Sequence, residues 1–434
     1  MLEQNHVPIP MQPAPVHRED WSTYWQKVGQ SWRTEPEIDG ARQEYLNQRL
    51  SIQPDLEEGI YPFKDIKLDR ADVEWLLANH ENGRGPVNWL DPFQRDRLGL
   101  DLRGADLRGA KLRALPLSHM LGGLTWRERD RTPERREMAA VHLEGAILSE
   151  AHLERAELYM AYLSRADLYM AHLENASLRK AHFEGASLRK AYLAYAGGQE
   201  LEKRGAKLSP ADLRACFFDS ATDLRSVYLG DKQHDFVRLA DVQWGGVNLA
   251  IIDWNPIRIL GDEGKARKMH YTDEDAHEAY IADYREAVRA NRQLAVALQG
   301  QGLNEEATRF SYRAQLLQRQ VLKYQRRPFA HFFSLFLDLL AGYGYKPARS
   351  IISYILVILM TAVVYFVLGA TFGPRFSPLG ALVFSLTSFH GRGFFPGGIP
   401  IDDPITVVAA LEAVVGLTIE ISFIATFTQR FFGK

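Results

Sequence analysis

The residues with the clearest chemical potential form a short stretch near the C-terminus, residues 385–396, with the sequence SLTSFHGRGFFP. Its glycines allow a tight turn, and backbone carbonyls in such a turn can replace the water shell of an inorganic ion. The same turn contains the guanidinium of Arg392. Rings of arginine favour anions and rings of acidic residues favour cations. The residues in and next to this turn are Thr387, Ser388, Phe389, His390, Gly391, Arg392 and Gly393.

A second group follows at helical spacing: Glu412, Gly416 and Glu420 are four residues apart and would share one helix face. A carboxylate in lipid is costly, so both glutamates should face a bundle interior or a water path. Two arrangements stay open for Glu412. If it pairs with Arg392 behind the filter, cations can pass; if Arg392 faces the axis instead, anions are favoured. Glu420 is the better candidate for a ring that lines a cavity.

The elements that must position these residues are apolar. Residues 350–370 carry no charge and are long enough to cross a bilayer, and residues 405–430 form a second run of similar length. Residues 378–388 are too short to span and predict a re-entrant pore helix, followed by a filter at 389–396. Non-helical backbone at this depth requires surrounding protein or a water-filled cavity.

The order of helix, short helix, glycine-rich turn and helix over residues 349–434 resembles the pore domain of two-transmembrane potassium channels. In that family a Thr-Thr-x-Gly-Tyr-Gly-Asp turn lines the ion path, so the resemblance implies that residues 387–393 form the ion filter. This chain differs from the pattern, since it has Arg392 at the central tyrosine and no aspartate after Gly393. The resemblance implies a homotetrameric channel in a bacterial inner membrane, and the departure from the family's turn predicts that the channel is not potassium-selective. It also implies inorganic ions as the permeating species, no cofactor, and a gating hinge at Gly416.

The composition of the chain excludes several classes of protein. The 434 residues have a net charge of −2, which gives no nucleic-acid signature, and a single cysteine excludes an internal disulfide framework. No nucleophile–base pair or metal-ligand spacing is evident, so we do not expect an enzyme or a metal. Basic residues flank the two long apolar runs on the ends that must share a side, which predicts cytoplasmic termini and a multi-pass topology. These residues are Arg326, Arg327, Lys346, Arg349, Arg430 and Lys434.

A five-residue period dominates the middle of the chain, residues 98–258, as in GADLR-GAKLR. A large apolar residue recurs every fifth position, with a small residue two positions earlier, which is neither a helix nor a flat strand pattern. The pattern resembles the pentapeptide-repeat family, and the resemblance implies a right-handed quadrilateral β-helix. Insertions near 118–140 and 196–210 interrupt it. Residues 20 apart should stack on adjacent coils.

Stacking places two columns of aromatic side chains on opposite outer faces of this predicted solenoid. One column contains His152, His172 and Tyr192, and the other contains His142, Tyr162 and His182. Stacked imidazoles could bind a metal, but the sequence shows no third and fourth ligand. We therefore expect solvated surface columns.

The remaining segments connect these parts, so the predicted fold class is multidomain. Residues 1–20 are proline-rich and predicted to be disordered, and residues 21–97 form a mixed cap. Residues 265–328 predict a helical hairpin linker. Residues 329–345 predict an interfacial helix and a turn at the bilayer surface.

The leading hypothesis is a tetrameric ion channel in a lipid bilayer, with a cytoplasmic pentapeptide-repeat body that regulates it. An unidentified cytoplasmic protein or ligand would shift the gating equilibrium by binding one state better. The alternative is a membrane-anchored oligomeric scaffold whose solenoid recruits a protein partner. A third hypothesis, a DNA-mimicking topoisomerase protector, requires an acidic solenoid, and this one mixes charge signs.

Overall fold

The chain divides into two compact units. The first contains residues 1–272 and 286–307, and the second contains residues 273–285 and 308–434. The computed structural model describes residues 21–128, 132–194, 210–231, 235–268, 276–371, 375–391 and 403–432. The predicted disordered leader, most of the second insertion, and Arg392 and Gly393 lie outside these residues.

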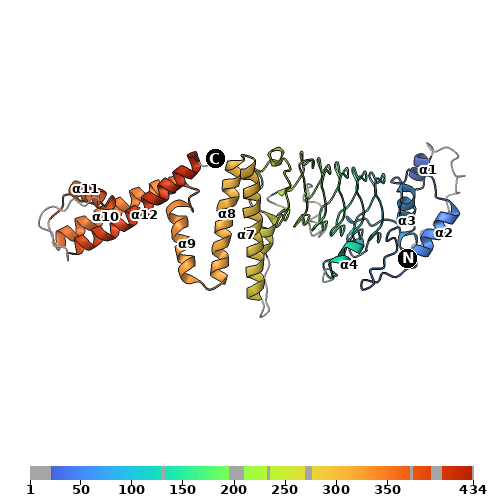
Figure 1. The fold of residues 1–434 in the computed structure, drawn as a ribbon, viewed down its shortest axis with the longest axis horizontal. Coiled ribbons are helices and arrows are strands. Elements are labelled where there is room, and N and C mark those ends of the chain that lie inside the picture. The colour runs from blue at the N-terminus through green and yellow to red at the C-terminus, as the bar shows by residue number, and fades with distance from the viewer. Residues whose placement is uncertain are drawn as a thin grey trace, which may run out of the picture. The chain divides into compact units, whose positions relative to one another are not determined.

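Three helices cover the N-terminal end of the first unit (Figure 1): α1 (Trp21–Lys27), α2 (Gly40–Leu50) and α3 (Arg70–Gly83). Helix α3 begins at a capping box in which the side chains of Asp69 and Asp72 each accept a backbone N–H. Buried Glu74 accepts the backbone N–H of Thr34 at 2.8 Å and the side chain of Arg70 at 2.7 Å. This carboxylate therefore holds the preceding loop on α3. A 3-10 helix, η2 (Pro92–Gln94), follows.

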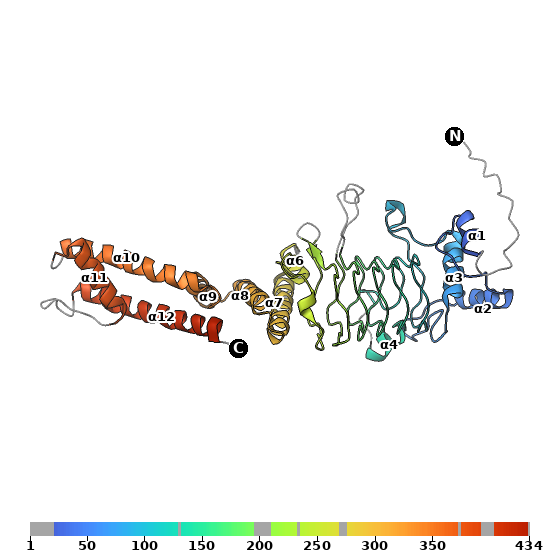
Figure 2. The same cartoon turned by 90° about the horizontal axis from the view of Figure 1, so that it is seen from above.

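The repeat region forms a solenoid whose coils are visible side by side in Figure 2. His142 forms a parallel bridge with Tyr162, and Tyr162 with His182, so each coil returns to the same face after 20 residues. Helix α4 (Pro133–Met138) lies in the first insertion, across which Asp106 pairs with His142. The ladder also reaches the cap, where Lys67 pairs with Asp106.

The coils in the described part of the chain contain isolated bridges rather than longer strands. The named strands, β1 (Gly230–Asp231) and β2 (Asp235–Phe236), form a small antiparallel hairpin. The predicted 20-residue coil is thus present, whereas the continuous strands that the word β-helix implies are not found there. The right-handedness of the coil stays a prediction.

The reason for single bridges is the corner at each pentad. Glu150 (φ 60°), Arg155 (φ 59°) and Met160 (φ 62°) begin a series in which every fifth residue up to Lys190 is left-handed. A left-handed non-glycine residue costs roughly 1–2 kcal/mol. Inter-coil hydrogen bonds offset this cost, for example from the N–H of Leu153 to the carbonyl of His172 at 2.8 Å.

Leucine and alanine fill the interior of the solenoid, as the sequence predicts. The large inward side chains are each at most 1% exposed: Leu143, Leu148, Leu153, Leu158, Leu163, Leu168, Leu173, Leu178, Phe183, Leu188 and Leu193. The alanines between them, such as Ala151 and Ala171, are fully buried. Truncating one such leucine to alanine typically costs about 2–5 kcal/mol.

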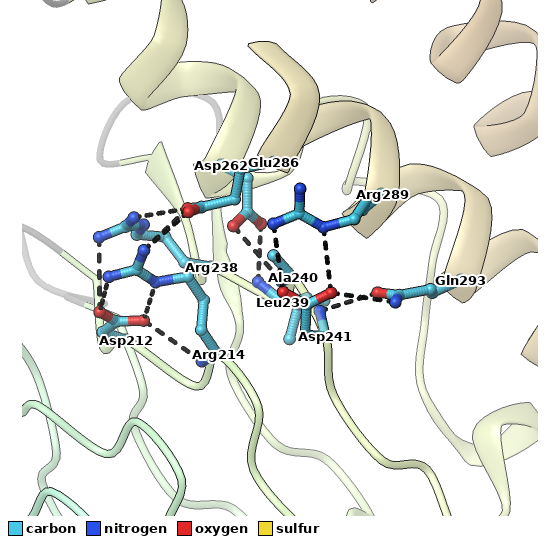
Figure 3. Close-up of polar contacts among 10 residues, drawn as sticks. All are labelled: Asp212, Arg214, Arg238, Leu239, Ala240, Asp241, Asp262, Glu286, Arg289 and Gln293. Carbon is cyan, nitrogen blue, oxygen red and sulfur yellow. Dashed lines mark hydrogen bonds and ion pairs between the residues drawn. The ribbon is translucent and has the colours of Figure 1, made fainter. Parts of the chain in front are cut away.

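The C-terminal end of the solenoid is closed by η3 (Leu249–Ile251), α6 (Gly261–Lys268) and α7 (Ala276–Gly300). Asp262 of α6 is 1% exposed and accepts the backbone N–H groups of Leu239 at 2.7 Å and Ala240 at 3.3 Å (Figure 3). Burial raises the pKa of Asp262 to about 6. This carboxylate satisfies donors that an open end of the ladder would leave unpaired.

An ionic cluster joins α7 to the last coils (Figure 3). Arg214 donates to Asp212 at 2.6 Å and to Glu286 of α7 at 2.9 Å, and Arg238 donates to Glu286 at 2.8 Å. Burial alone would raise the pKa of Asp212, but the hydrogen bonds and charge of Arg214 lower it to about 2. The cluster therefore keeps its charges paired in a partly dehydrated site.

Two further polar contacts extend this docking surface along the helix. Gln293 accepts the backbone N–H of Asp241 at 2.8 Å, and Arg289 donates to the Asp241 carboxylate at 3.2 Å. Beyond α7, Gln301 donates to the carbonyl of Val247 at 2.6 Å. The second half of α7, from Glu286 onward, is thus held by the solenoid at several points.

The helices after residue 303 are α8 (Asn304–Tyr324), α9 (Pro328–Ala341), α10 (Pro347–Thr371), α11 (Pro378–Phe389) and α12 (Pro404–Phe432). Two of the described helices are long and apolar enough to cross a membrane, over Ala348–Thr371 and Pro404–Ile424. In the most apolar stretch of each, 11% and 22% of the residues are buried within the chain. Most residues of these stretches are therefore not buried within the single chain.

Asp338 ties the helices at the start of this apolar part together. It accepts the hydroxyl of Tyr312 at 2.8 Å, Arg319 at 2.8 Å and Arg349 at 2.9 Å. Burial would raise the pKa of Asp338, but Arg319 and Tyr312 lower it below its usual range. Gly342 ends α9 in the left-handed conformation, so the Gly-Tyr-Gly segment that follows is a turn.

We expect Glu286→Ala to weaken the docking of α7 by about 1–3 kcal/mol, because it removes the carboxylate that accepts from both Arg214 and Arg238. Hydrogen–deuterium exchange of residues 286–300 in the full-length protein should then become faster. Glu278→Ala, at an exposed position of the same helix, is the matched control and should leave exchange unchanged. Equal exchange in both variants would contradict a docking role for the cluster.

Candidate pore site

Helix α11 lies against both membrane-length helices and contacts α12 over much of its length. In the middle of α11, Phe384 packs with Tyr365 of α10 and Ile405 of α12. At its end, Phe389 packs with Ile419 of α12. The rise of α12 between Ile405 and Ile419 is about 21 Å at 1.5 Å per residue. The end of α11 therefore lies about 21 Å along α12 from the level of Phe384.

Along α10 the order of contacts is reversed. The ring centroid of Phe384 lies 4.8 Å from that of Tyr365, whereas Phe389 lies 4.9 Å from Tyr354. Helix α11 thus runs back along α10. From its end at His390 the chain must reach Pro404, and the intervening backbone spans at most about 45 Å when extended. A short helix that runs antiparallel to the preceding long helix is the arrangement expected of a re-entrant segment.

Glu412 lies where α10, α11 and α12 meet, and it is 3% exposed. Its carboxylate accepts three hydroxyl hydrogen bonds, each 2.6 Å long, from Thr361, Tyr365 and Ser385. An unpaired carboxylate in this apolar setting would cost several kcal/mol, and the three donors remove that penalty. The Glu412 carboxylate thus has hydrogen-bond donors without Arg392. Arg392 lies outside the described residues, so its pairing with Glu412 stays a prediction.

Gly416 lies one turn further along α12, against the end of α11. A Cβ atom there would come within 2.0 Å of the carbonyl oxygen of Phe389. Glycine is therefore required for the close approach of the two backbones. The structure gives Gly416 a packing role, and its role as a gating hinge stays a prediction.

The Glu420 carboxylate pairs with Nδ1 of His390. The Tyr354 hydroxyl lies 3.2 Å from Nε2 of the same imidazole ring. The His390 and Glu420 side chains are 37% and 36% exposed. They border a cavity of about 260 Å³. Its lining residues are Phe389, His390, Gly391, Ala413, Val414, Leu417 and Glu420. The two predicted acidic residues of α12 thus have different environments, one buried in the helix junction and one at a cavity.

The other predicted filter residues are split by the end of α11. Thr387, Ser388 and Phe389 belong to the helix, and the carbonyl of Ser388 accepts the N–H groups of His390 and Gly391. Gly391 has a left-handed φ of 65°. The first predicted filter residues therefore end the short helix, and the turn proper begins at His390.

Three site residues were missed by the sequence reasoning: Thr361, Tyr365 and Ser385. The signal for them was present, since Thr361 and Tyr365 are hydroxyls four residues apart in a run of apolar residues. Hydroxyls in a helix can also donate to a carbonyl of their own helix, as Thr361 can to Val357 at 2.8 Å. The shared acceptor Glu412 was therefore identified by the fold.

A comparison with protein families matches the description "Pentapeptide repeats", in eight copies, over residues 137–173 and 166–196. This part of the chain therefore carries pentapeptide repeats. No curated protein matches the chain. The C-terminal helices lie outside the matched family residues.

Among solved structures, one similar chain is a pentapeptide repeat protein from the thylakoid lumen of Arabidopsis thaliana, with 20% identity over 33% of this chain and 67% of that one, and a TM-score of 0.18. Another is HetL from Nostoc sp. strain PCC 7120, with 21% identity over 34% of this chain and 55% of that one, and a TM-score of 0.15. A third is Rfr23 from Cyanothece 51142, with 23% identity over 32% and 90%, and a TM-score of 0.15. These values carry no argument about activity.

We expect Gly416→Ala to separate α12 from the end of α11, because the new methyl group has no room beside the Phe389 carbonyl. A loss of about 1–3 kcal/mol in the free energy of unfolding should follow, measured by thermal unfolding of the full chain in detergent. Gly380→Ala in α11 is the matched control, because the nearest atom there is a side-chain oxygen at 3.1 Å. Equal melting temperatures for both variants would show that the close contact is absent.

We expect Glu412→Ala to lower the free energy of unfolding by about 1–3 kcal/mol, because the Tyr365 hydroxyl loses the carboxylate to which it donates. Thr361 and Ser385 keep main-chain carbonyl acceptors but lose their shared link to α12. Glu420→Gln, on the same helix but beside the cavity, should change it by less than about 1 kcal/mol. Denaturant titration of both variants in the same detergent measures the difference. Similar losses at the two positions would argue against a junction centred on Glu412.

Proposed function

We propose that this chain, which carries pentapeptide repeats at residues 137–196, is one subunit of a homotetrameric membrane ion channel with a cytoplasmic regulatory body. One observation carries the proposal: short helix α11 is held by Glu412 between two helices of membrane length and ends deep along them. A helix end and a turn at that depth need protein or water around them. An ion path between subunits supplies both.

The exposed surface of α10 and α12 supports assembly. Large apolar residues on these helices face outward in the single chain, among them Leu356 (55%), Met360 (61%), Leu411 (63%) and Val414 (66%). Two spanning helices cannot enclose a water path alone, so copies must close around a shared axis. The number four comes from the resemblance to two-transmembrane channels.

The cavity beside α11 supports an aqueous route. Glu420 is partly exposed on a membrane-length helix, a position that a carboxylate tolerates next to water or a neighbouring charge. Four such carboxylates would concentrate cations below the filter, whereas a ring of Arg392 would favour anions. The ion selectivity of the channel is set by which of these charges faces the path.

The solenoid is the proposed site of control. A protein or ligand that binds the solenoid better in one state of the channel would shift the population of that state. Helix α7 is held firmly on the last coil by Glu286 and Gln293 and contributes residues to both units. Helix α7 is therefore the element that would couple partner binding on the solenoid to the membrane-length helices. The expected location is the inner membrane, with both termini in the cytoplasm.

Purified full-length protein in planar bilayers should show unitary currents. Arg392→Ala and Glu420→Gln should each shift the reversal potential in a salt gradient, in opposite directions, because one removes a positive and the other a negative charge from the proposed path. Glu278→Gln, at an exposed position of α7 outside the membrane-length helices, is the control and should leave the reversal potential unchanged.

An absence of currents at every tested pH, calcium concentration and membrane tension would overturn the channel proposal. If deletion of residues 385–396 also left cellular function intact, the alternative of a membrane-anchored scaffold would replace it. The scaffold alternative is supported by one observation: the sequence of the turn differs from the potassium-channel pattern.

A further inference from the structure

Two buried glutamates occupy adjacent coils on one outer face of the solenoid. Glu154 and Glu174 are 1% and 3% exposed, and the histidines two residues before them, His152 and His172, form a parallel bridge. The two imidazole rings stack with centroids 4.9 Å apart. The 20-residue coil therefore brings two His-x-Glu segments into register. Like charges stacked this closely in a dehydrated site repel each other unless a proton or a cation lies between them.

The hydrogen bonds around these carboxylates leave one oxygen unsatisfied. Glu154 accepts the hydroxyl of Ser118 at 2.7 Å and pairs with Nδ1 of His152 at 2.8 Å. Glu174 pairs with Nδ1 of His172 at 3.3 Å through one oxygen. Its other oxygen, Oε2, is buried and has no hydrogen-bond partner among the described residues. A buried acceptor of this kind costs about 1–3 kcal/mol, more if it is charged.

Ligand atoms of Glu154, His172 and Glu174 all lie within 4.8 Å of one another. Ligand atoms 2.0–2.2 Å from a tetrahedral metal ion are about 3.5 Å from one another. Shifts of about 1 Å in the glutamate carboxylates would therefore bring the three ligand atoms to this spacing. We propose that these three residues bind a divalent transition-metal ion such as Zn²⁺, which cross-links two neighbouring coils. The unsatisfied oxygen of Glu174 is the vacant ligand that such an ion would use.

The donor set indicates the class of ion. One imidazole nitrogen with two carboxylates suits Zn²⁺ and related first-row ions, whereas Ca²⁺ and Mg²⁺ prefer oxygen ligands throughout. His152 does not need to ligate, because its hydrogen bond to Glu154 orients that carboxylate.

The opposite face of the solenoid carries a natural control. His182 and Glu184 have the same spacing and pair at 3.0 Å, but the Glu184 side chain is 36% exposed. The stacked position in the preceding coil is Ser164, whose hydroxyl donates to Glu184 at 3.1 Å. A single exposed carboxylate with satisfied oxygens offers no ion site. The adjacency of two buried glutamates therefore distinguishes the proposed site from an ordinary His-x-Glu pair.

The test is Zn²⁺ titration by isothermal calorimetry on chelator-treated full-length protein in detergent at pH 7.5, with Glu174→Gln, His172→Gln and the control Glu184→Gln. We expect wild type and the control to share a site that the other two variants lose or bind at least tenfold more weakly. Ca²⁺ and Mg²⁺ at the same concentrations should not occupy it. Unchanged stoichiometry and affinity in Glu174→Gln would overturn the proposal.

A second measurement does not depend on the folding of any variant. Zinc-edge X-ray absorption of the wild-type protein at less than one equivalent of Zn²⁺ should show one imidazole with oxygen donors. A shell with two or more imidazoles would place the ion elsewhere and reject the site. Neither experiment involves ion conduction, so its outcome is independent of the channel proposal.

Discussion

The Glu412 carboxylate accepts hydrogen bonds from Thr361, Tyr365 and Ser385 in the middle of an otherwise apolar helix junction. Because these hydrogen bonds are lost if one helix moves away, a single buried side chain makes the positions of α10, α11 and α12 interdependent. The close approach at Gly416 and the cavity beside Glu420 both lie further along the same contact. The geometry of the candidate pore site therefore depends on this junction.

The solenoid meets a different constraint. Its corners use left-handed residues, most of them not glycine, and each corner is strained. The ladder between coils compensates for this strain, but a ladder has two open ends with unpaired N–H and C=O groups. The structure covers both ends, with the bridge from Lys67 at the first coil and with Asp262 at the last. The repeat is thus stable as part of a capped unit rather than as a series of independent pentads.

Buried carboxylates recur across the molecule, and their partners explain their burial. Glu74 accepts backbone N–H groups of a loop, Asp262 accepts those at the end of the ladder, and Glu412 accepts hydroxyls. Glu174 differs, since one of its oxygens has no partner among the described residues. This unpartnered oxygen, next to a second buried glutamate and two stacked imidazoles, is the reason to propose a cation at the pair.

The sequence alone determined the elements with strong periodicity. A five-residue period specifies which side chains point inward, and apolar length specifies which helices match a membrane, because both depend on local spacing. The columns of residues 20 apart followed from the same period. The sequence also singled out Glu412, Gly416 and Glu420, because charge and glycine are unusual in an apolar run.

Tertiary structure decided what those residues contact. Sequence placed Glu412, Gly416 and Glu420 on one helix face, but whether that face meets a hydroxyl, a backbone carbonyl or a cavity depends on how α11 packs. The same holds for Glu154 and Glu174, whose burial depends on the neighbouring coils. Local patterns report which side chains point the same way, whereas hydrogen-bond partners far apart in the sequence are chosen by the packing of the whole chain.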